Sequence, residues 1–594
     1  MVSDEEADVV VIGSGMGGLS AARAIAQFGG RRVLVLEQHY TLGGMTHEFS
    51  RAGRYRFGTG LHYMSASAGP FLGFMTDGRA QLSPLPDEYD ALHFPGFDFS
   101  VPATKERFRE RLKERFPAEA DAIDGFFRTT RWAMAGLAAR NVFASFPAGK
   151  AGAFIVERLF PSTYRSLRDQ VSRSFRDPQL RAVLAARWGL YGTPPESSAF
   201  GYHAAVPLTF FMEGTAHPVG GPQELNRVVL EILQRYGVVL RSRQTVREVV
   251  VEGGKVTGVD VQDTATGLRY RVRTDTVVSA AGVRNTYALI GKSHELEDLP
   301  EERSAVMLFL GLDRSPAEFG LRGENHWLMP DLDEHDSILR PPGEGTLYVS
   351  FASLNNPAAR FHTVEVLELV DPKVVEQWRG TPENERPAGY RKFKDELTER
   401  MLARLEERWP GFRETIAFAE LGTPLSFETY QHSVLGSFYG RLGVGFRQFL
   451  AQHVGPLGQL HPPLDRPRQH VHPVPPSCRG GYEAPPANRP GTREVPRGRR
   501  SPATDQPSEQ HEHTTLRPHQ RPGLRIQDEN ASVSVPRSAP PRRLHTAMRG
   551  PDTAVLAHRG DQQPGSGNSA GQRHRLRWGD QSGAQLPQYG RDGR

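Results

Sequence analysis

Three glycines and one acidic residue near the N-terminus have the spacing of a dinucleotide-binding site. Residues 13–18 read Gly-Ser-Gly-Met-Gly-Gly, so Gly13, Gly15 and Gly18 satisfy G-x-G-x-x-G, and Glu37 follows 19 residues later. The first glycine permits a tight turn, the second lets the backbone approach a pyrophosphate, and the third lets a helix pack close to a strand. Glu37 is placed to accept hydrogen bonds from ribose hydroxyls. The pattern therefore predicts a dinucleotide site that includes these four residues and Ser14.

The flanking residues predict the elements that hold these glycines. Residues 9–12 form a short apolar run of β-branched residues, which is typical of a buried parallel strand. Residues 19–26 favour a helix that ends at Gly29-Gly30, and residues 33–36 predict a second strand. The result is a βαβ unit whose helix N-terminus offers free N–H groups and partial positive charge to phosphates.

The next segment resembles a known family. Residues 37–64 read EQHYTLGGMTHEFSRAGRYRFGTGLHYM. An acidic residue at the end of the second strand, followed by Gly-Gly, resembles the FAD-binding entry of the phytoene desaturase, carotenoid isomerase and all-trans-retinol 13,14-reductase group. The run FGTGLHY is most similar to the retinol reductase branch. The resemblance implies FAD as cofactor and adds Gly43, Gly44 and Met45 to its site. That branch usually has an acidic residue before Thr-Gly, where this chain has Gly58.

A second stretch, residues 217–259, supports the same interpretation. Leu225, Val229, Ile232 and Leu233 predict a helical stripe, and the residues after it predict three strands with a turn at 253–254. Residues 275–282, DTVVSAAG, predict another short strand. In the family that the chain resembles, the position of Val246 places its backbone against the adenine.

The residues between these two stretches predict a different kind of structure. Residues 104–140 predict a helix in which Phe108, Leu112 and Phe116 repeat at a spacing of four. The arginines on its other faces leave two interpretations open: a solvated face above a core stripe, which we favour, or a surface that docks on an anionic membrane. The runs RWGLYGTPPESSAFGYHAAV from Arg187 and ELGTPLSFETYQHSVLGSFYG from Glu420 resemble substrate-domain segments of the group.

We therefore expect an α/β protein with a Rossmann-like FAD-binding domain of the amine oxidase and phytoene desaturase type, an inserted α+β substrate domain and a disordered C-terminal tail. The predicted domain pieces are the FAD-binding domain at 1–84 and 211–294, the substrate domain at 85–210 and 295–415, the start of a return to the FAD domain at 416–450, and the tail at 451–594.

The residues do not suggest catalysis by the protein's own nucleophile or metal. No Ser/His/Asp set, paired-carboxylate motif or metal-ligand spacing stands out, and this agrees with a flavin that performs hydride transfer itself. His62 and Tyr63 are the catalytic candidates, because the resemblance places their segment beside the flavin ring. Three interpretations stay open for these side chains: one of them donates a proton, one of them orients the substrate, or the two form a purely structural pair.

Three functions follow from the resemblance. The first is an FAD-dependent oxidoreductase that saturates, desaturates or isomerises an isoprenoid polyene, with a nicotinamide nucleotide, NAD(P), as a candidate electron partner. A flavin amine oxidase shares the N-terminal fingerprint, and a non-catalytic prenyl-binding protein shares the fold. The intact glycines with Glu37 favour an enzyme, and FGTGLHY favours the polyene substrate.

Composition limits the partners and the compartment. The first 450 residues carry a formal charge of −4, and all excess positive charge lies in residues 451–594, so nucleic acid is not a predicted partner. Cys478 is the single cysteine, which leaves the first 450 residues without disulfides or thiolate ligands. An acidic N-terminus and the absence of a long uncharged apolar run predict a cytoplasmic protein, with peripheral membrane association as an open alternative.

The last 144 residues have the composition of a disordered chain. Residues 451–594 hold 21 of the 46 prolines, one isoleucine and no phenylalanine or lysine. Such a segment buries too little apolar surface to fold. The glycine-rich segment with which the family closes its FAD site is not found there. A natural tail and an out-of-frame translation of a GC-rich gene, beginning near 442–455, both explain the composition, and we favour the frameshift.

Overall fold

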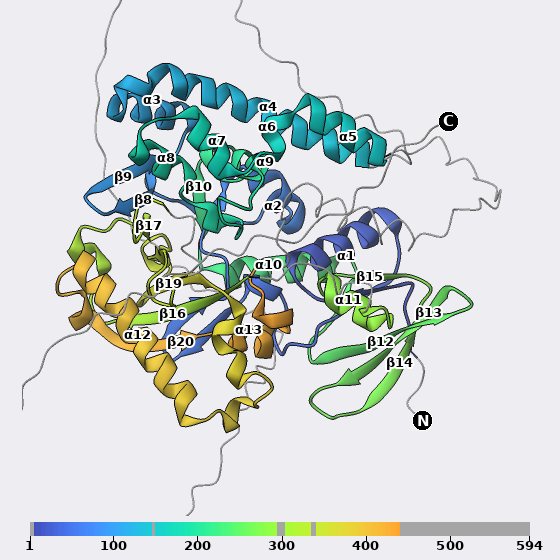
Figure 1. The fold of residues 1–594 in the computed structure, drawn as a ribbon. Coiled ribbons are helices and arrows are strands. Elements are labelled where there is room, and N and C mark those ends of the chain that lie inside the picture. Colours follow the sequence, from blue (N-terminus) through green and yellow to red (C-terminus); the bar gives the residue numbers. More distant parts are fainter. Residues whose placement is uncertain (1–4, 145–148, 294–302, 334–339, 440–594) are drawn as a thin grey trace, which may run out of the picture. The chain divides into compact units, whose positions relative to one another are not determined.

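The computed structural model describes residues 5–144, 149–293, 303–333 and 340–439 (Figure 1). The predicted tail, 451–594, and the predicted frameshift region, 442–455, lie outside these described residues. Within the described ranges, no helix is both long and apolar enough to cross a lipid bilayer.

A parallel four-stranded sheet contains the first predicted strands. Its order is β11 (Val239–Arg241), β3 (Val33–Leu36), β2 (Val9–Ile12) and β15 (Val277–Ser279). Helix α1 (Met16–Gly29) joins β2 to β3 and ends at Gly30, whose φ of 60° is left-handed. The predicted strand–turn–helix–strand unit is confirmed.

The sheet is buried on both faces because side chains alternate along β2. Val9 and Val11 pack with residues of α1 and of α10 (Pro222–Arg235). Val10 and Ile12 face the opposite way, toward a second layer. This second layer has the order β1 (Glu5–Glu6), β14 (Arg269–Arg273), β13 (Lys255–Asp263) and β12 (Gln244–Glu252), and α11 (Val283–Leu289) follows β15. All neighbours in this layer are antiparallel except β1 and β14. Predicted strands on either side of residues 253–254 are thus confirmed.

A seven-stranded sheet forms the other large layer. Its order is β20 (Ile416–Gly422), β16 (Ser304–Leu312), β19 (His362–Val370), β18 (Leu347–Ser350), β17 (Asn325–Leu328), β8 (Glu88–Phe94) and β9 (Phe97–Pro102). All neighbours are antiparallel except β17 and β8, where Asn325 pairs with Asp90. Val306, Leu308 and Leu310 of β16 pack with residues of α12 (Ala388–Arg408), whereas Met307 and Phe309 face the other main core.

The position of β20 differs from the predicted domain division. Residues from 416 onward were expected to begin the return to the FAD domain. Instead Leu421 pairs with Leu308, so β20 completes the seven-stranded sheet. We therefore propose that the return starts after Gly422, at α13 (Pro424–Gln431).

Small pairings connect the N-terminal segment to the rest of the protein. Strand β10 (Thr215–Pro218) lies between β6 (Met64–Ser65) and β7 (Leu82–Pro84), and β4 (Glu48–Arg51) pairs with β5 (Tyr55–Gly58). Helix α2 (Gly69–Thr76) follows β6.

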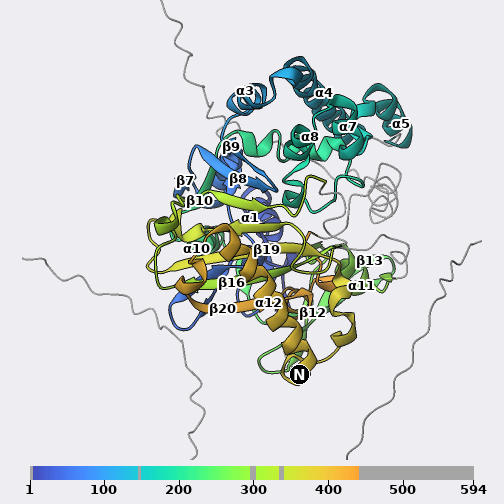
Figure 2. The ribbon, with the colours of Figure 1, turned by 60° about the vertical axis from the view of Figure 1, so that its left-hand side comes forward.

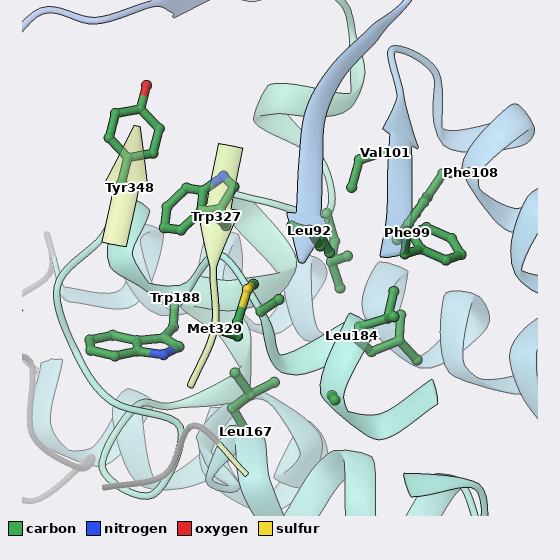
Figure 3. Packing of buried hydrophobic residues seen from close by; sticks show 14 of the residues in the cluster. Leu92, Phe99, Val101, Phe108, Leu167, Leu184, Trp188, Trp327, Met329 and Tyr348 are labelled. Carbon is green, nitrogen blue, oxygen red and sulfur yellow. The ribbon is translucent and has the colours of Figure 1, made fainter. Parts of the chain in front are cut away.

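Helices cover the β8–β9 end of the seven-stranded sheet, as Figures 1 and 2 show. They are α3 (Lys105–Arg115), α4 (Ala120–Ala144), α5 (Gly149–Leu159), α6 (Pro161–Tyr164), α7 (Leu167–Ser174), α8 (Pro178–Ala185) and α9 (Phe200–Ala205). Figure 3 shows Phe108 of α3 beside Phe99 and Val101 of β9.

The single helix predicted over 104–140 is wrong in one respect. Phe116 leaves the helical conformation, with φ −128° and ψ 63°, because Pro117 follows it and disfavours a helical residue before it. The stripe of Phe108, Leu112 and Phe116 is buried as predicted. Arg107 and Arg111 pair with Asp87 and Glu88 of the same protein, which favours the core-stripe interpretation of α3 over membrane docking.

Candidate functional site

A cavity of about 800 Å³ opens where the carboxyl ends of β2 and β3 meet β12 and β15. Ligands of open parallel sheets bind at this edge. The predicted residues Gly13, Gly15, Glu37, Gly44, Met45 and Val246 line it. Ser14, Gly18 and Gly43 lie behind this lining and shape it.

The three fingerprint glycines meet different spatial demands. Gly13 has a φ of 93°, which side chains rarely adopt. A Cβ atom on Gly18 would lie 2.1 Å from the carbonyl oxygen of Gly13, so helix and turn pack too closely for any side chain. A Cβ atom on Gly15 would meet no atom within 4 Å, because that side of the loop faces the cavity.

Ser14 and Glu37 fix the loop to the end of β3. The backbone N–H and the hydroxyl of Ser14 both donate to Oε2 of Glu37, at 2.8 and 2.7 Å, and the N–H of His39 donates to Oε1 at 2.9 Å. The N–H of Gly43 in turn donates to the Ser14 hydroxyl at 3.0 Å. The Glu37 carboxylate therefore holds the glycine loop in place. The remaining lone pairs of its two oxygens are available to a ligand in the cavity.

The second glycine pair packs onto the first. A Cβ atom on Gly44 would lie 2.8 Å from the Cα atom of Gly15. A Cβ atom on Gly43 would lie 2.4 Å from Oδ1 of Asn226, whose amide donates to the carbonyl oxygen of Leu42 at 2.8 Å. Asn226 was not predicted from the sequence. It is a fully buried polar residue inside the apolar stripe of α10, and that interruption was the available signal.

These features fit a bound FAD. Gly15 is the N-cap residue of α1 and has no side chain to cap the helix. The first N–H groups of the helix therefore remain available to a pyrophosphate. Glu37 offers carboxylate oxygens next to that position, and Val246 in β12 forms the far wall. Because Gly15 has no side chain, a phosphate can approach the backbone there. We expect Gly13, Gly15 and Glu37 to hold the cofactor, with Ser14 and Gly18 supporting them.

A second cavity, of about 310 Å³, adjoins the first. Met45 and Phe438 line both cavities. Aromatic side chains dominate the wall of the second cavity: Tyr63, Trp188, Phe211, Trp327, Tyr348 and Tyr439. Figure 3 shows Trp327 beside Tyr348, with Trp188 below them. His62 and Thr346 are its other polar side chains, and no residue of the described lining carries a carboxylate or carboxamide.

The two catalytic candidates, His62 and Tyr63, both line this second cavity but differ in their contacts. The hydroxyl of Tyr63 donates to Oδ2 of Asp90 at 3.5 Å, and burial raises the pKa of Tyr63 well above its usual value of 10.0. Nδ1 of His62 lies 2.7 Å from Oε2 of Glu365, whereas its Nε2 has no hydrogen-bond partner among the described residues. Tyr63 therefore keeps its proton, whereas His62 has a ring nitrogen without a partner among the described residues.

Asp90 and Arg187 form a buried charged pair behind the aromatic wall. Nη1 of Arg187 lies 3.7 Å from Oδ2 of Asp90 and donates to the Tyr89 hydroxyl at 2.7 Å. Burial, partly offset by Arg187, raises the pKa of Asp90 to about 6. The hydroxyl of Tyr348 donates to Asn325, whose amide reaches Asp90 at 3.5 Å. This pair was not predicted from the sequence, although Arg187 begins a segment that resembles the group's substrate domain.

Comparison with known proteins places the chain among flavoproteins. The sequence profile described as "Flavin containing amine oxidoreductase" matches residues 16–389. All-trans-retinol 13,14-reductase of Danio rerio is 27% identical over 477 residues, which cover 73% of this chain and 78% of that protein. Prolycopene isomerase of Arabidopsis thaliana is 26% identical over 481 residues, covering 74% and 76%. The structure of cyclohexylamine oxidase from Brevibacterium oxydans IH-35A aligns at 14% identity with a TM-score of 0.49, covering 77% of this chain and 90% of that one.

Proposed function

The chain belongs to the family of flavin containing amine oxidoreductases, and from that premise we propose that it transfers hydride to or from a carbon–carbon double bond of an isoprenoid polyene. The protein is an FAD-dependent oxidoreductase. When bound, the flavin supplies the hydride chemistry, and the chain binds substrate, excludes water and handles the accompanying proton. The curated relatives, a retinol reductase and a prolycopene isomerase, confirm the resemblance predicted from FGTGLHY.

The observation that carries this proposal is the junction of the two cavities. Met45 and Phe438 border both, so a substrate in the aromatic cavity lies next to the cofactor cavity. Flat aromatic walls suit a conjugated hydrocarbon, which needs no hydrogen-bonding partner from the wall.

An amine substrate is a poorer match to this wall. A protonated amine requires an anionic or strongly polar partner when it leaves water. The described lining of the aromatic cavity has no carboxylate. The nearby carboxylates lie behind that lining, Glu365 behind His62 and Asp90, which pairs with Arg187, behind Tyr63.

The test is conversion of a polyene by the FAD-loaded protein in the absence of oxygen. Loss of a conjugated double bond shortens the chromophore, so saturation is expected to shift the absorbance of a carotenoid or retinoid to shorter wavelength. A nicotinamide nucleotide is the proposed electron source, and dithionite replaces it in a parallel sample. Flavin reduction by a primary amine, without change in any polyene, would contradict the proposal.

The variant Leu369→Trp tests whether the polyene binds in the aromatic cavity, and its flavin content serves as the internal control. Leu369 lies in β19 and lines the aromatic cavity without lining the cofactor cavity. Trp at this position fills the cavity, so polyene conversion is expected to cease while flavin content stays at the parent level. Equal conversion by parent and variant would place the polyene elsewhere.

We further propose that an anionic lipid surface docks on helices α4 and α5, which lie side by side in Figures 1 and 2. The apolar patch there consists of Trp132, Phe154, Ile155 and Leu159, with side chains 51–67% exposed. Arg128, Arg131 and Arg158 are exposed on the same helices and complement lipid phosphates. A polyene is delivered from a lipid phase because it is nearly insoluble in water.

Vesicle sedimentation tests this docking. The full chain is expected to sediment with vesicles that contain phosphatidylserine and less with pure phosphatidylcholine. The double variant Trp132→Ser/Phe154→Ser is expected to lose most of this binding. Phe28→Ser is the control, because Phe28 is 74% exposed but lies on α1. Equal loss in both variants would show that the α4–α5 patch has no special role.

A further inference from the structure

Glu365 is an unusual residue for its position. It lies in β19, a strand buried on both faces apart from its first residue, and its side chain is only 5% exposed. A carboxylate at such a position costs free energy unless donors compensate it. The other acid of the strand, Glu368, accepts the N–H groups of Gly343 and Gly345 at 2.7 and 2.8 Å, which accounts for it as a loop anchor.

The partners of Glu365 lie in the N-terminal segment, about 300 residues away. The N–H of Gly58 donates to Oε1 at 2.7 Å, and Oε2 lies 2.7 Å from Nδ1 of His62, at an angle away from a linear hydrogen bond. Glu365 thus joins the seven-stranded sheet to the FGTGLHY run at the wall of the aromatic cavity.

The position of Glu365 coincides with a departure from the family pattern. The branch that this chain resembles usually has an acidic residue where this chain has Gly58. A Cβ atom on Gly58 would lie 3.5 Å from Oε1 of Glu365, which is ordinary van der Waals contact, and Gly58 does not have a positive φ. An acidic side chain at residue 58 would therefore start in contact with the Glu365 carboxylate.

We propose that Glu365 supplies from β19 the carboxylate that Gly58 lacks, and that it positions His62 to exchange a proton with the polyene through Nε2. The proposal rests on the proposed polyene chemistry. The carboxylate keeps the Nδ1 proton in place, so the unpartnered Nε2 faces the reaction with a free lone pair or, in the imidazolium, with a proton to give.

The reaction balances with this assignment. In saturation, the π bond between two carbons breaks and two C–H bonds form. One carbon would receive hydride, which a bound reduced flavin would supply, and the other would receive the proton of His62 Nε2, which solvent then replaces. Desaturation runs the same steps backward, with Nε2 as the acceptor.

Other groups near the cavity are poorly suited to this role. Burial raises the pKa of Tyr348, as it does that of Tyr63, well above 10.0, so both phenols keep their protons. Burial lowers the pKa of His217 to about 4, so this neighbour is neutral, and it does not line the aromatic cavity. His62 is the imidazole in the described lining of that cavity.

The first test needs no turnover. In the full chain with FAD, ¹⁵N NMR of labelled histidine reports the tautomer of His62, identified as the signal that His62→Gln removes. The parent is expected to carry the proton on Nδ1 in the neutral ring. Glu365→Leu, which cannot accept a hydrogen bond, is expected to shift the proton to Nε2. An unchanged tautomer in Glu365→Leu would overturn the positioning role.

The swap variant Gly58→Asp/Glu365→Leu separates positioning from mere stability. It returns a carboxylate to the family position and is expected to restore the Nδ1 tautomer. Glu368→Gln is the matched control, since it removes a buried acid from the same strand and is expected to leave the His62 tautomer unchanged. Failure of the swap to restore the tautomer, in a protein that retains flavin, would contradict the proposed equivalence of the two positions.

Kinetics provide the second readout. Glu365→Leu is expected to lower kcat for the polyene about tenfold or more, while KM changes little, and His62→Gln is expected to lower kcat roughly 10²–10⁴-fold. The swap variant should recover most of the loss. If the parent converts no polyene but the tautomer responds as expected, the proposed substrate is wrong and the Glu365–His62 pairing stands. If the polyene is converted and the tautomer does not respond, the pairing is wrong.

Discussion

The two adjoining cavities are built by opposite means. The cofactor cavity is shaped chiefly by backbone: Gly13, Gly18 and Gly44 let segments approach where side chains would collide, and Gly15 leaves the backbone open toward the cavity. The aromatic cavity is shaped by large side chains that come from distant parts of the chain. A cavity shaped by backbone tolerates few substitutions, because an added side chain would meet backbone atoms that cannot move aside. A side-chain cavity adjusts, so substitutions there are expected to have graded effects.

The largest effect is expected at Gly15. Gly15→Val should weaken FAD binding by about 3 kcal/mol or more, roughly a hundredfold, because its side chain would occupy the pyrophosphate position. Flavin absorbance after purification measures the loss. Gly17→Val is the control, since a Cβ atom there also meets nothing within 4 Å but Gly17 is exposed and does not line the cavity. Equal flavin content in both variants would refute the contrast between backbone and side-chain cavities.

A moderate effect is expected from His203, a neutral histidine behind the aromatic side. Its Nε2 donates to the carbonyl oxygen of Leu184 at 2.8 Å, and burial lowers the pKa of His203 to about 3. Because this pKa lies below the unfolded value of about 6.5, stability is fully present above pH 6.5 and declines as pH falls.

Between pH 6.5 and pH 5 this histidine should lower the free energy of unfolding by about 1.6 kcal/mol. Urea unfolding of the parent and of His203→Gln at both pH values measures the difference, since Gln remains uncharged and can still donate to Leu184. The variant should lose about that much of the pH dependence. The same dependence in both proteins would show that His203 is not buried as described.

The smallest effect is expected at the junction of the cavities. A Cβ atom on Gly60 would lie 2.5 Å from Cε of Met45, the flexible end of a side chain that borders both cavities. Gly60→Ala should displace Met45, leave flavin content unchanged and lower polyene turnover severalfold, about 1 kcal/mol. Gly73→Ala is the control, because its Cβ atom has open space within α2. Loss of flavin in Gly60→Ala would place the disturbance in the cofactor cavity instead.

The sequence could predict the parts that depend on local pattern. The strand from Val9, the turn at Gly13 and the helix that ends at Gly30 are contiguous, and each has its own signal in residue type and spacing. The apolar stripe of α10 could likewise be predicted, because Leu225, Val229 and Leu233 repeat with helical spacing.

Contacts between distant segments could not be predicted in this way. The approach of Glu365 to His62 depends on how β19 packs beside β5, and the Asp90–Arg187 pair depends on burial by several helices. No local period in the sequence records such packing. The break at Phe116 is different, since Pro117 was a visible signal that the apolar repeat outweighed.

The strands of the seven-stranded sheet are synthesised far apart in time. Strands β8 and β9 are complete at Pro102, but their partner β17 begins at Asn325, more than 200 residues later. At roughly 5–20 residues per second, the ribosome needs about 11–45 s to reach that partner. Throughout this interval the hairpin presents an unpaired edge to other nascent chains. Yield of this protein in a cell should therefore depend on the chaperones that cover this edge, and on translation speed between residues 102 and 325.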